Sequence, residues 1–276
     1  SRRQRQMCIR DRSMMAPLYL IDEYSDLPPS HFALSDPEGL IAVSQTVSAR
    51  LVWRAYHQGY YPCSPIGEEL TLWWAPTERL VLRPHELHLS KNFKKQLRAI
   101  RREEQHAYAA IQVTVNQCFE EVIQACAAIP RQQDFDGGWI SDEIIEAYSE
   151  LHRHGMAHSF ETWQDGELIG GLYGVSLGQI FCGESMFSKL SQASRIAFSH
   201  AVPFLAQQGI RLIDCQQDSE YLRSFGATLI PRADYEFYLQ QLAYAAAPVH
   251  WPSGRISLDG QYIRAVSAGE DNDAVL

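Results

Sequence analysis

The sequence contains no apolar run long enough to cross a bilayer as a helix, so we expect no membrane-spanning segment. Its six cysteines form no C-x-x-C pair and show no metal spacing with histidine, which is typical of reduced cytosolic thiols. Positive charge is scarce, because 24 Lys and Arg stand against 33 Asp and Glu for a net charge of -9. This balance disfavours broad non-specific binding to nucleic acid, although a local basic patch can still bind RNA.

The length of 276 residues, 46% of them hydrophobic and 21% charged, provides material for one large or two modest domains. We predict an α+β protein with a small N-terminal α/β domain at 14–79 and a larger domain at 80–247. Residues 1–13 are rich in Arg and Gln and lack the apolar core of a signal peptide. We expect them to be a non-native or disordered leader, and residues 248–276, which have little pattern, to form a surface tail.

The element order of the larger domain indicates its fold. Alternating apolar residues predict strands at 157–163, 168–176 and 179–187, joined by the hairpin signals Asp165-Gly166 and Leu177-Gly178. Two helices precede this antiparallel meander, and a helix, a strand, a short helix and a strand follow it. This order is typical of the GNAT-type acyltransferase fold, which has a central, mostly antiparallel sheet.

Two carboxylates interrupt apolar strand runs in that domain. Glu184 lies within 181–187 and Asp214 within 212–216, and a buried carboxylate is costly unless it is paired, hydrogen-bonded or used in chemistry. Gln216 is two residues beyond Asp214, so strand alternation aims both side chains at one spot. Gln216 could orient an amine while Asp214 accepts its proton, and Glu184 could hold a cationic group or a ribose hydroxyl. The alternative for Asp214 is a structural carboxylate tied to backbone amides.

Aromatic and basic residues supply two further candidates. Trp73 and Trp74 are adjacent, so one indole could face a cavity, although both could instead pack between the domains. The stretch 91–102 has no acidic residue and predicts a helix with an apolar face for docking and a basic face for solvent or a polyanion. Its basic residues are Lys91, Lys94, Lys95, Arg98, Arg101 and Arg102.

A glycine-rich turn is missing where a GNAT-type fold normally holds coenzyme A. The corresponding place, 191–195, contains no glycine. An ordinary acetyl-CoA enzyme is therefore disfavoured, and another activated acyl donor has to be considered.

Several runs closely resemble the leucyl/phenylalanyl-tRNA-protein transferase family, in the same order over about residues 40–238. They are 72–76 (LWWAP), 139–141 (WIS), 158–159 (HS), 170–175 (GGLYGV), 181–188 (FCGESMFS), 212–216 (LIDCQ) and 224–227 (SFGA). The resemblance implies a bacterial cytosolic enzyme that moves Leu or Phe, with Met as a further candidate, from aminoacyl-tRNA to an N-terminal Arg or Lys. The product would enter N-end-rule degradation. No cofactor or metal is implied, and we expect a monomer.

The same resemblance assigns roles to individual residues. Asp214 and Gln216 would form the catalytic relay, and Glu184 would bind the basic acceptor or the end of the donor. The basic helix would bind the tRNA backbone. The substrate-binding set implied around the amino acid and the terminal adenosine comprises Leu172, Phe181, Met186, Trp139, Trp73, Trp74 and Tyr56.

The chain departs from the family pattern at three helper positions, where Cys63 replaces a Trp and Ser219 and Tyr221 replace an Asn and a His. Two other hypotheses therefore remain beside an active aminoacyltransferase. One is a diverged GNAT-type acyltransferase with another donor, and the other is a non-catalytic tRNA-binding paralogue.

Overall fold

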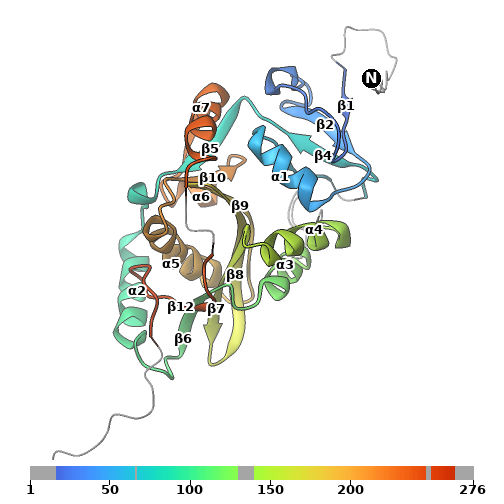
Figure 1. Ribbon diagram of the computed structural model, residues 1–276. Helices are drawn as coiled ribbons and strands as arrows, with labels where there is room; N and C mark the ends of the chain where they lie inside the picture. The colour runs from blue at the N-terminus through green and yellow to red at the C-terminus, as the bar shows by residue number, and fades with distance from the viewer. Residues whose placement is uncertain (1–16, 66, 130–139, 247–249, 265–276) are drawn as a thin grey trace, which may run out of the picture.

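The computed structural model describes residues 17–65, 67–129, 140–246 and 250–264, and Figure 1 shows that they are arranged around two sheets. The smaller sheet has four strands in the order β1-β2-β4-β3, and the larger has eight in the order β11-β5-β10-β9-β8-β7-β6-β12. The expected α+β class is confirmed, with a small N-terminal sheet and a larger, mostly antiparallel sheet. The expected leader, 1–13, lies outside the described residues.

The smaller sheet precedes residue 75 and packs on one amphipathic helix, α1 (Ala49–His57). Ser48 begins this helix, because its hydroxyl accepts a hydrogen bond from Leu51 N at 3.1 Å. A short 3-10 helix, Ser30–Phe32, lies between β1 and β2. The strands are β1 (Tyr19–Leu20), β2 (Leu40–Ser44), β3 (Tyr61–Pro62) and β4 (Thr71–Trp74).

The larger sheet contains the predicted antiparallel meander, β7-β8-β9. Its only parallel pair within the described residues is β9 with β10, since every other neighbouring pair is antiparallel. The strands are β5 (Glu78–Leu82), β6 (Ile111–Val115), β7 (Ala157–Gln164), β8 (Glu167–Leu177), β9 (Ile180–Ser188), β10 (Leu212–Gln216), β11 (Thr228–Pro231) and β12 (Gly254–Arg255).

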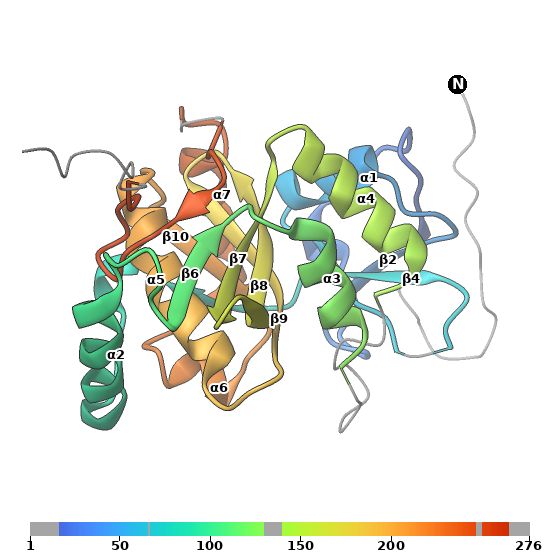
Figure 2. The same cartoon turned by 90° about the horizontal axis from the view of Figure 1, so that it is seen from below.

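Helices cover both faces of the larger sheet, as the views in Figures 1 and 2 show. On one face α5 packs against the middle strands and α2 lies outside it, forming one hydrophobic cluster. On the other face α3 packs against β7, β8 and β9, while α4 packs against β7 and α3 and also contacts α1. The helices are α2 (Lys91–Glu103), α3 (Phe119–Ala127), α4 (Asp142–Arg153), α5 (Ala193–Gln207), α6 (Glu220–Arg223) and α7 (Arg232–Leu242), with a 3-10 turn at Pro84–Glu86.

Part of the expected surface tail is instead built into the larger domain. Trp251 is 2% exposed and stacks on His158 with ring centroids 3.8 Å apart, and Ile256 is 1% exposed. β12 extends the sheet by pairing with β6. The expectation of a surface tail is therefore wrong for residues 250–264, because contacts with residues distant in sequence, rather than a local pattern, hold them.

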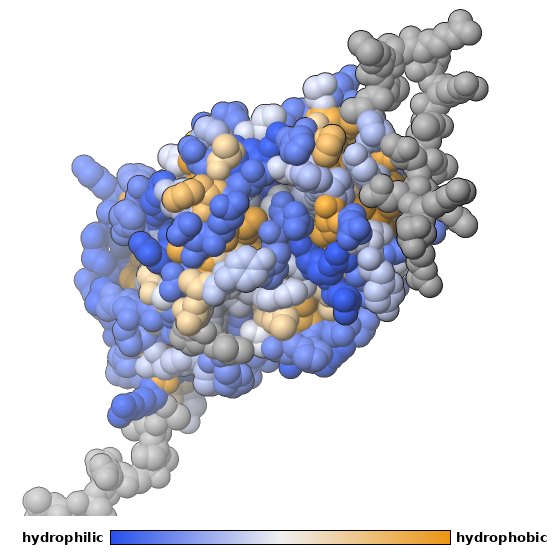
Figure 3. All heavy atoms as spheres, turned by 45° about the horizontal axis from the view of Figure 1, so that its top comes forward, coloured by the Kyte–Doolittle hydropathy of each residue, from blue (hydrophilic) through white to orange (hydrophobic). Residues whose placement is uncertain are grey.

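The two sheets share one hydrophobic cluster, which runs from Trp73 and Tyr56 on the N-terminal side to Tyr148 and Tyr173 on the side of the larger sheet. The division near residue 79 therefore stays a prediction about domains, although it coincides with the change of sheet between β4 and β5. Figure 3 shows a mostly hydrophilic face on which apolar groups form separate patches. Among the described residues, no helix is long and apolar enough to span a membrane.

Candidate active site

The central feature of the site is the place where the parallel strands β9 and β10 separate. Their pairing runs from Leu212–Ile180 to Asp214–Cys182 and ends there. Immediately beyond, each strand has a bulge on its outer side. Glu184 is skipped in the pairing of β9 with β8, and Cys215 is skipped in the pairing of β10 with β5. We call this place the β9/β10 fork, and it brings Glu184 and Gln216 together from opposite arms.

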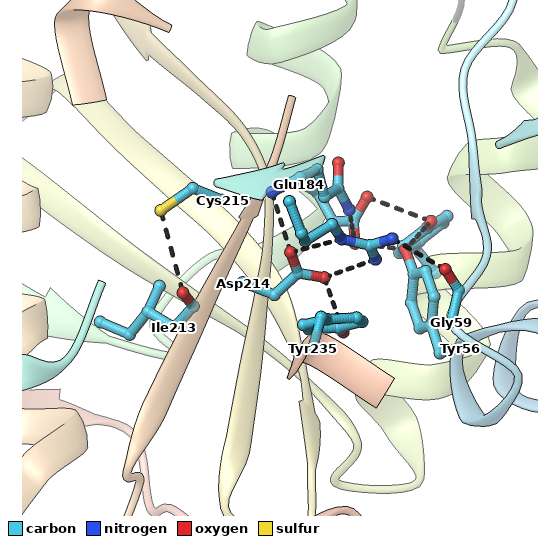
Figure 4. Close-up of polar contacts among 10 residues, drawn as sticks. Tyr56, Gly59, Glu184, Ile213, Asp214, Cys215 and Tyr235 are labelled. Carbon is cyan, nitrogen blue, oxygen red and sulfur yellow. Dashed lines mark hydrogen bonds and ion pairs between the residues drawn. The ribbon is translucent and has the colours of Figure 1, made fainter. Parts of the chain in front are cut away.

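Glu184 stands at the fork with three polar side chains around its carboxylate. Tyr56 from α1 donates to Oε1, Gln216 Nε2 donates to Oε1 at 3.2 Å, and Tyr148 from α4 donates to Oε2 at 3.3 Å. The hydroxyls of Tyr56 and Tyr148 are themselves 2.5 Å apart. Figure 4 shows Tyr56 approaching Glu184 from the side of α1. Glu184 is therefore oriented by residues from α1, α4 and β10.

Burial raises the pKa of Glu184 from 4.5 to about 7, and the charge of Asp214 also raises it. The hydrogen bonds from Tyr56, Gln216 and Tyr148 act in the opposite direction and do not offset burial. Burial and the neighbouring Glu184 also raise the pKa values of Tyr56 and Tyr148 well above their ordinary values, so both phenols remain protonated donors. Glu184 is thus a carboxylate that can exchange a proton near neutral pH.

Asp214 is fully buried and has different partners from Glu184. Arg79 from β5 forms a forked pair with it, Nε to Oδ1 at 2.9 Å and Nη2 to Oδ2 at 2.7 Å. Tyr235 from α7 donates to Oδ2 at 3.0 Å, as Figure 4 shows. The two carboxylates of the site are therefore unequal, because Asp214 has a cationic partner and Glu184 has only neutral donors.

Gln216 connects the two carboxylates, but not in the way that strand alternation predicts. Its backbone N–H donates to Oδ1 of Asp214 at 2.9 Å, while its side-chain amide turns to Glu184. Its φ of +63° lies in the left-handed region, which non-glycine residues adopt infrequently. The bulge at Cys215 and this backbone conformation give Gln216 and Asp214 separate side-chain partners.

The two cysteines that flank the carboxylates do not have the properties of nucleophiles. Cys182 is buried and Cys215 is half-buried. Burial and the charge of Asp214 raise the pKa values of both thiols. They remain protonated at neutral pH, whereas a nucleophilic cysteine needs its thiolate form.

The predicted side-chain pocket residues share one face of the sheet. Leu172 and Phe181 are buried in the cluster beneath α5, and Met186 is partly exposed and packs on the same cluster. Phe181 and Met186 are five positions apart, so in a regular strand they would face opposite sides. The bulge at Glu184 restores a common face, and their role as an amino-acid pocket stays a prediction.

The adjacent indoles of β4 have different surroundings. Trp73 is fully buried and donates to Ser44 Oγ at 2.9 Å, whereas Trp74 is partly exposed and donates to the carbonyl of Cys63 at 2.6 Å. Trp74 lines a cavity of about 290 Å³ beside the fork. One of the two indoles therefore faces a cavity, as the sequence suggested. The other lining residues are Glu38, Tyr61, Pro76, Thr77, Glu78, Gln217, Asp218 and Leu229.

The basic helix forms as predicted and lies on the outer side of α5. Phe93 and Leu97 are buried and Ile100 is partly buried, which confirms the docking face. All six predicted cationic residues of α2 are exposed. Arg101 pairs with Asp259 at 2.6 Å, and this is the only ion pair of the six within the described part of the chain.

Three residues of the network around the fork were not singled out from the sequence. Tyr148 lies on the buried face of α4, and Tyr235 lies in a helix with no distinguishing pattern. Arg79 carries a weaker signal than Glu184 and Asp214, because it follows the charged Glu78 at the start of the strand 78–82 and does not interrupt an apolar run. Trp139, a predicted substrate-binding residue, lies outside the described residues.

No cluster of three His, Cys, Asp or Glu side chains suited to a metal ion occurs in the parts of the chain that the structure describes.

Comparison with known proteins places the chain in a family. The family model described as leucyl/phenylalanyl-tRNA protein transferase matches residues 81–240. A leucyl/phenylalanyl-tRNA–protein transferase of Teredinibacter turnerae is 47% identical over 214 residues, which are 78% of this chain and 78% of the relative. The protein of the same name from Saccharophagus degradans is 45% identical over 80% of this chain and 86% of its own. That of Bordetella petrii is 43% identical over 84% and 90%.

Solved structures give weaker matches. FemX aligns with a TM-score of 0.38 and 10% identity over 69% of each chain. A GCN5-related N-acetyltransferase from Kribbella flavida aligns with a TM-score of 0.32 and 14% identity over 69% of this chain and 65% of that chain. The sequence relatives, which match most of the chain at more than 40% identity, and the family model, which matches more than half of it, show that the chain belongs to the leucyl/phenylalanyl-tRNA-protein transferase family.

Proposed function

We propose that this protein transfers Leu or Phe, with Met as a further candidate donor, from aminoacyl-tRNA to the N-terminal Arg or Lys of acceptor proteins in the bacterial cytoplasm. Its products would then be substrates of N-end-rule degradation. The observation that carries the proposal is the fork, where Glu184 is held between tyrosine hydroxyls and the amide of Gln216. Membership of the family supports the donor class.

The reaction needs proton handling and positioning more than a nucleophilic side chain, because an aminoacyl ester is already activated. The acceptor amine attacks the ester carbonyl carbon, so a C–N bond forms. The bond from that carbon to the ribose oxygen of the terminal adenosine breaks, and the proton lost by the amine ends on that oxygen. Glu184, with its pKa raised to about 7, suits the transient acceptance of that proton.

The acceptor is proposed to lie between the fork and the neighbouring cavity. Glu184 would accept hydrogen bonds from the α-ammonium group, and the cavity beside Gln217 would hold the basic side chain. The rings of Tyr61 and Trp74 offer faces to a cation, and Glu78 offers a carboxylate. Asp218 already pairs with Arg223, so Glu78 is the more available charge.

The donor is proposed to bind through its tRNA body and its amino acid. The exposed cations of α2 suit a phosphate backbone in a chain whose net charge is otherwise -9. Leu172, Phe181 and Met186 are the proposed apolar contacts of the transferred side chain, and Tyr56, Trp73, Trp74 and Trp139 complete the proposed donor side. The relay predicted from the sequence joins Asp214 to Gln216, whose backbone N–H donates to Asp214 Oδ1 at 2.9 Å.

A coenzyme A thioester is the alternative donor that a GNAT-type fold suggests. The start of α5, where its pyrophosphate would be bound, has no glycine, and Ser194 N already donates to Ser188 Oγ at 2.8 Å. An amide that is engaged in this way is not free for a phosphate oxygen. The structure thus favours aminoacyl-tRNA over coenzyme A.

The proposed function is tested with leucyl-, phenylalanyl- and methionyl-tRNA in parallel, each mixed with a peptide that begins with Arg. Mass spectrometry should find the peptide extended by the donor residue, and a matched peptide beginning with Ala should stay unmodified. Extension from acetyl-CoA with none from any charged tRNA would support the alternative donor. Binding of tRNA without extension of any peptide would support the non-catalytic paralogue.

A further inference from the structure

Arg79 is a buried cation held by an unusually complete set of contacts. It is 2% exposed within β5, and its guanidinium donates to both oxygens of Asp214 and, at 2.7 Å, to the carbonyl of Gly59. Its Cζ lies 4.7 Å from the ring centroid of Tyr61 and 4.3 Å from that of Tyr235. Arg79 therefore connects the larger sheet to the loop after α1, to β3 and to α7, next to the fork.

The contacts of Asp214 leave no acceptor position for a substrate. An ionised carboxylate offers about four lone-pair sites. Oδ1 accepts from Arg79 Nε and from Gln216 N, and Oδ2 accepts from Arg79 Nη2 and from Tyr235 OH. A proton delivered to Asp214 would have to displace one of these donors and would break a buried ion pair.

The same contacts fix the conformation of Gln216. Its N–H bond to Oδ1 of Asp214 accompanies the left-handed backbone at φ +63°, which costs free energy for a residue with a side chain. This turn directs the side-chain amide across the fork to Glu184, at 3.2 Å. The direction of Gln216 thus depends on Asp214, and the position of Asp214 depends on Arg79.

We propose that Arg79 is a positioning residue of the transfer reaction, which acts through Asp214 to hold the amide of Gln216 against Glu184. Asp214 is then an ionised anchor, and the proton passes to Glu184 and not to Asp214. This inference rests on the proposed function, since it concerns the same site. Residue types alone suggest a relay through Asp214. In this proposal Asp214 positions Gln216, and Glu184 accepts the proton.

The first test is the replacement Arg79→Lys, which keeps the charge but loses the two-pronged contact. We expect kcat to fall by roughly 10- to 100-fold, because Asp214 and Gln216 lose their fixed geometry. The KM for leucyl-tRNA should stay within about threefold, since Arg79 does not contact the proposed tRNA surface on α2. Arg83→Lys, a half-buried arginine just after the same strand, is the matched control and should keep the parent kcat.

A milder variant keeps the inference testable if Arg79→Lys folds poorly. Tyr235→Phe removes one donor from Asp214 and keeps the ring beside Arg79, so a threefold to tenfold loss of kcat at unchanged KM is expected. Circular dichroism and thermal melting establish that each variant is folded before its kinetics are compared. A kcat within twofold of the parent for both variants, or a loss confined to KM, would overturn the proposal.

A paired replacement separates the anchor role from the proton-acceptor role. Arg79→Gln combined with Asp214→Asn removes both buried charges and keeps an oxygen at residue 214 that can accept from Gln216 N. An anchor predicts residual transfer, with kcat within about 1000-fold of the parent and well above a no-enzyme blank. If transfer falls to the blank in a folded double variant, Asp214 is the proton acceptor and the proposal is wrong.

A readout without turnover distinguishes this proposal from the proposed function. The titration of Glu184 can be followed by NMR of a carboxyl-labelled side chain. The groups that face it are Tyr56 from α1, Cys63 after β3, Tyr148 from α4, Tyr173 from β8, Cys182 from β9 itself, and Asp214 and Gln216 from β10. In Arg79→Lys the amide of Gln216 should no longer donate to Glu184, so the titration midpoint of Glu184 should rise. An unchanged midpoint would overturn the positioning role of Arg79, whether or not the parent transfers an amino acid. Absence of transfer by the parent would instead refute the proposed function alone.

Discussion

Ionisation of Glu184 is predicted to reduce the stability of the folded protein, and Glu184→Gln should remove that penalty. Burial is the main reason why its pKa rises from 4.5 to about 7. Because the folded-state pKa is the higher one, the folded state loses stability relative to the unfolded state as pH rises from about 4.5. The loss levels off above about pH 7, where the carboxylate is ionised in both states.

The expected magnitude follows from the two pKa values. Each pKa unit corresponds to about 1.4 kcal/mol, so the interval between 4.5 and about 7 corresponds to roughly 3 kcal/mol at pH 8. At pH 5 the penalty is only about 1 kcal/mol, since Glu184 is still mostly protonated in the folded state. Gln does not titrate, so the free energy of unfolding of Glu184→Gln, relative to the parent, should rise by about 2 kcal/mol between pH 5 and pH 8.

Urea denaturation of parent and variant at pH 5, 6, 7 and 8 measures this difference. Packing changes caused by the substitution contribute equally at each pH and cancel in the comparison. Glu150→Gln, at an exposed position of α4, is the matched control and should show no such trend. If the difference between Glu184→Gln and the parent is the same at pH 5 and pH 8, the assignment of Glu184 as the penalised carboxylate is refuted.

Four further outcomes are expected. Charge reversal at Lys94, Lys95 and Arg98 should weaken tRNA binding and reduce the slope of log K against log salt by roughly 3 in a binding assay, while acceptor-peptide KM stays unchanged. Tyr148→Phe removes a donor from Glu184 and should raise its NMR titration midpoint and lower kcat, in contrast to a control at a distant tyrosine such as Tyr108. Glu78→Gln should raise KM for an Arg-peptide several-fold and leave tRNA affinity unchanged in kinetic and binding assays. Trp251→Ala should lower the free energy of unfolding by about 3–5 kcal/mol, whereas a true surface tail would show almost no change.

Local patterns predicted most of the larger domain. The antiparallel meander follows from strand alternation and two hairpin turns, and α2 follows from the apolar face that Phe93 and Leu97 share within the basic stretch 91–102. Residues 250–264 could not be predicted in the same way. Trp251 is buried against His158, and β12 pairs with β6, so the stabilising partners are more than 90 residues away in the chain.

The candidate site was predictable in its residue types but not in its geometry. Glu184 and Asp214 were identifiable because each is a carboxylate within an apolar strand, where burial costs free energy unless the group is paired, hydrogen-bonded or used in chemistry. The two bulges beside the fork cannot be predicted from the alternation of apolar and polar residues, and they determine which side chains contact each other. The pairing of Asp214 with Arg79 depends on the neighbouring position of β5 and β10, which only the folded sheet shows. Strand alternation therefore suggested a relay where the structure has an ion pair.

The most direct test of the account is transfer of labelled leucine from leucyl-tRNA to an Arg-peptide at pH 8 by the parent and by Glu184→Gln. The account predicts transfer by the parent and a rate at least about 100-fold lower in the variant, with leucyl-tRNA affinity unchanged. Equal rates for the two proteins would contradict the claim that Glu184 at the β9/β10 fork handles the proton of the acceptor amine.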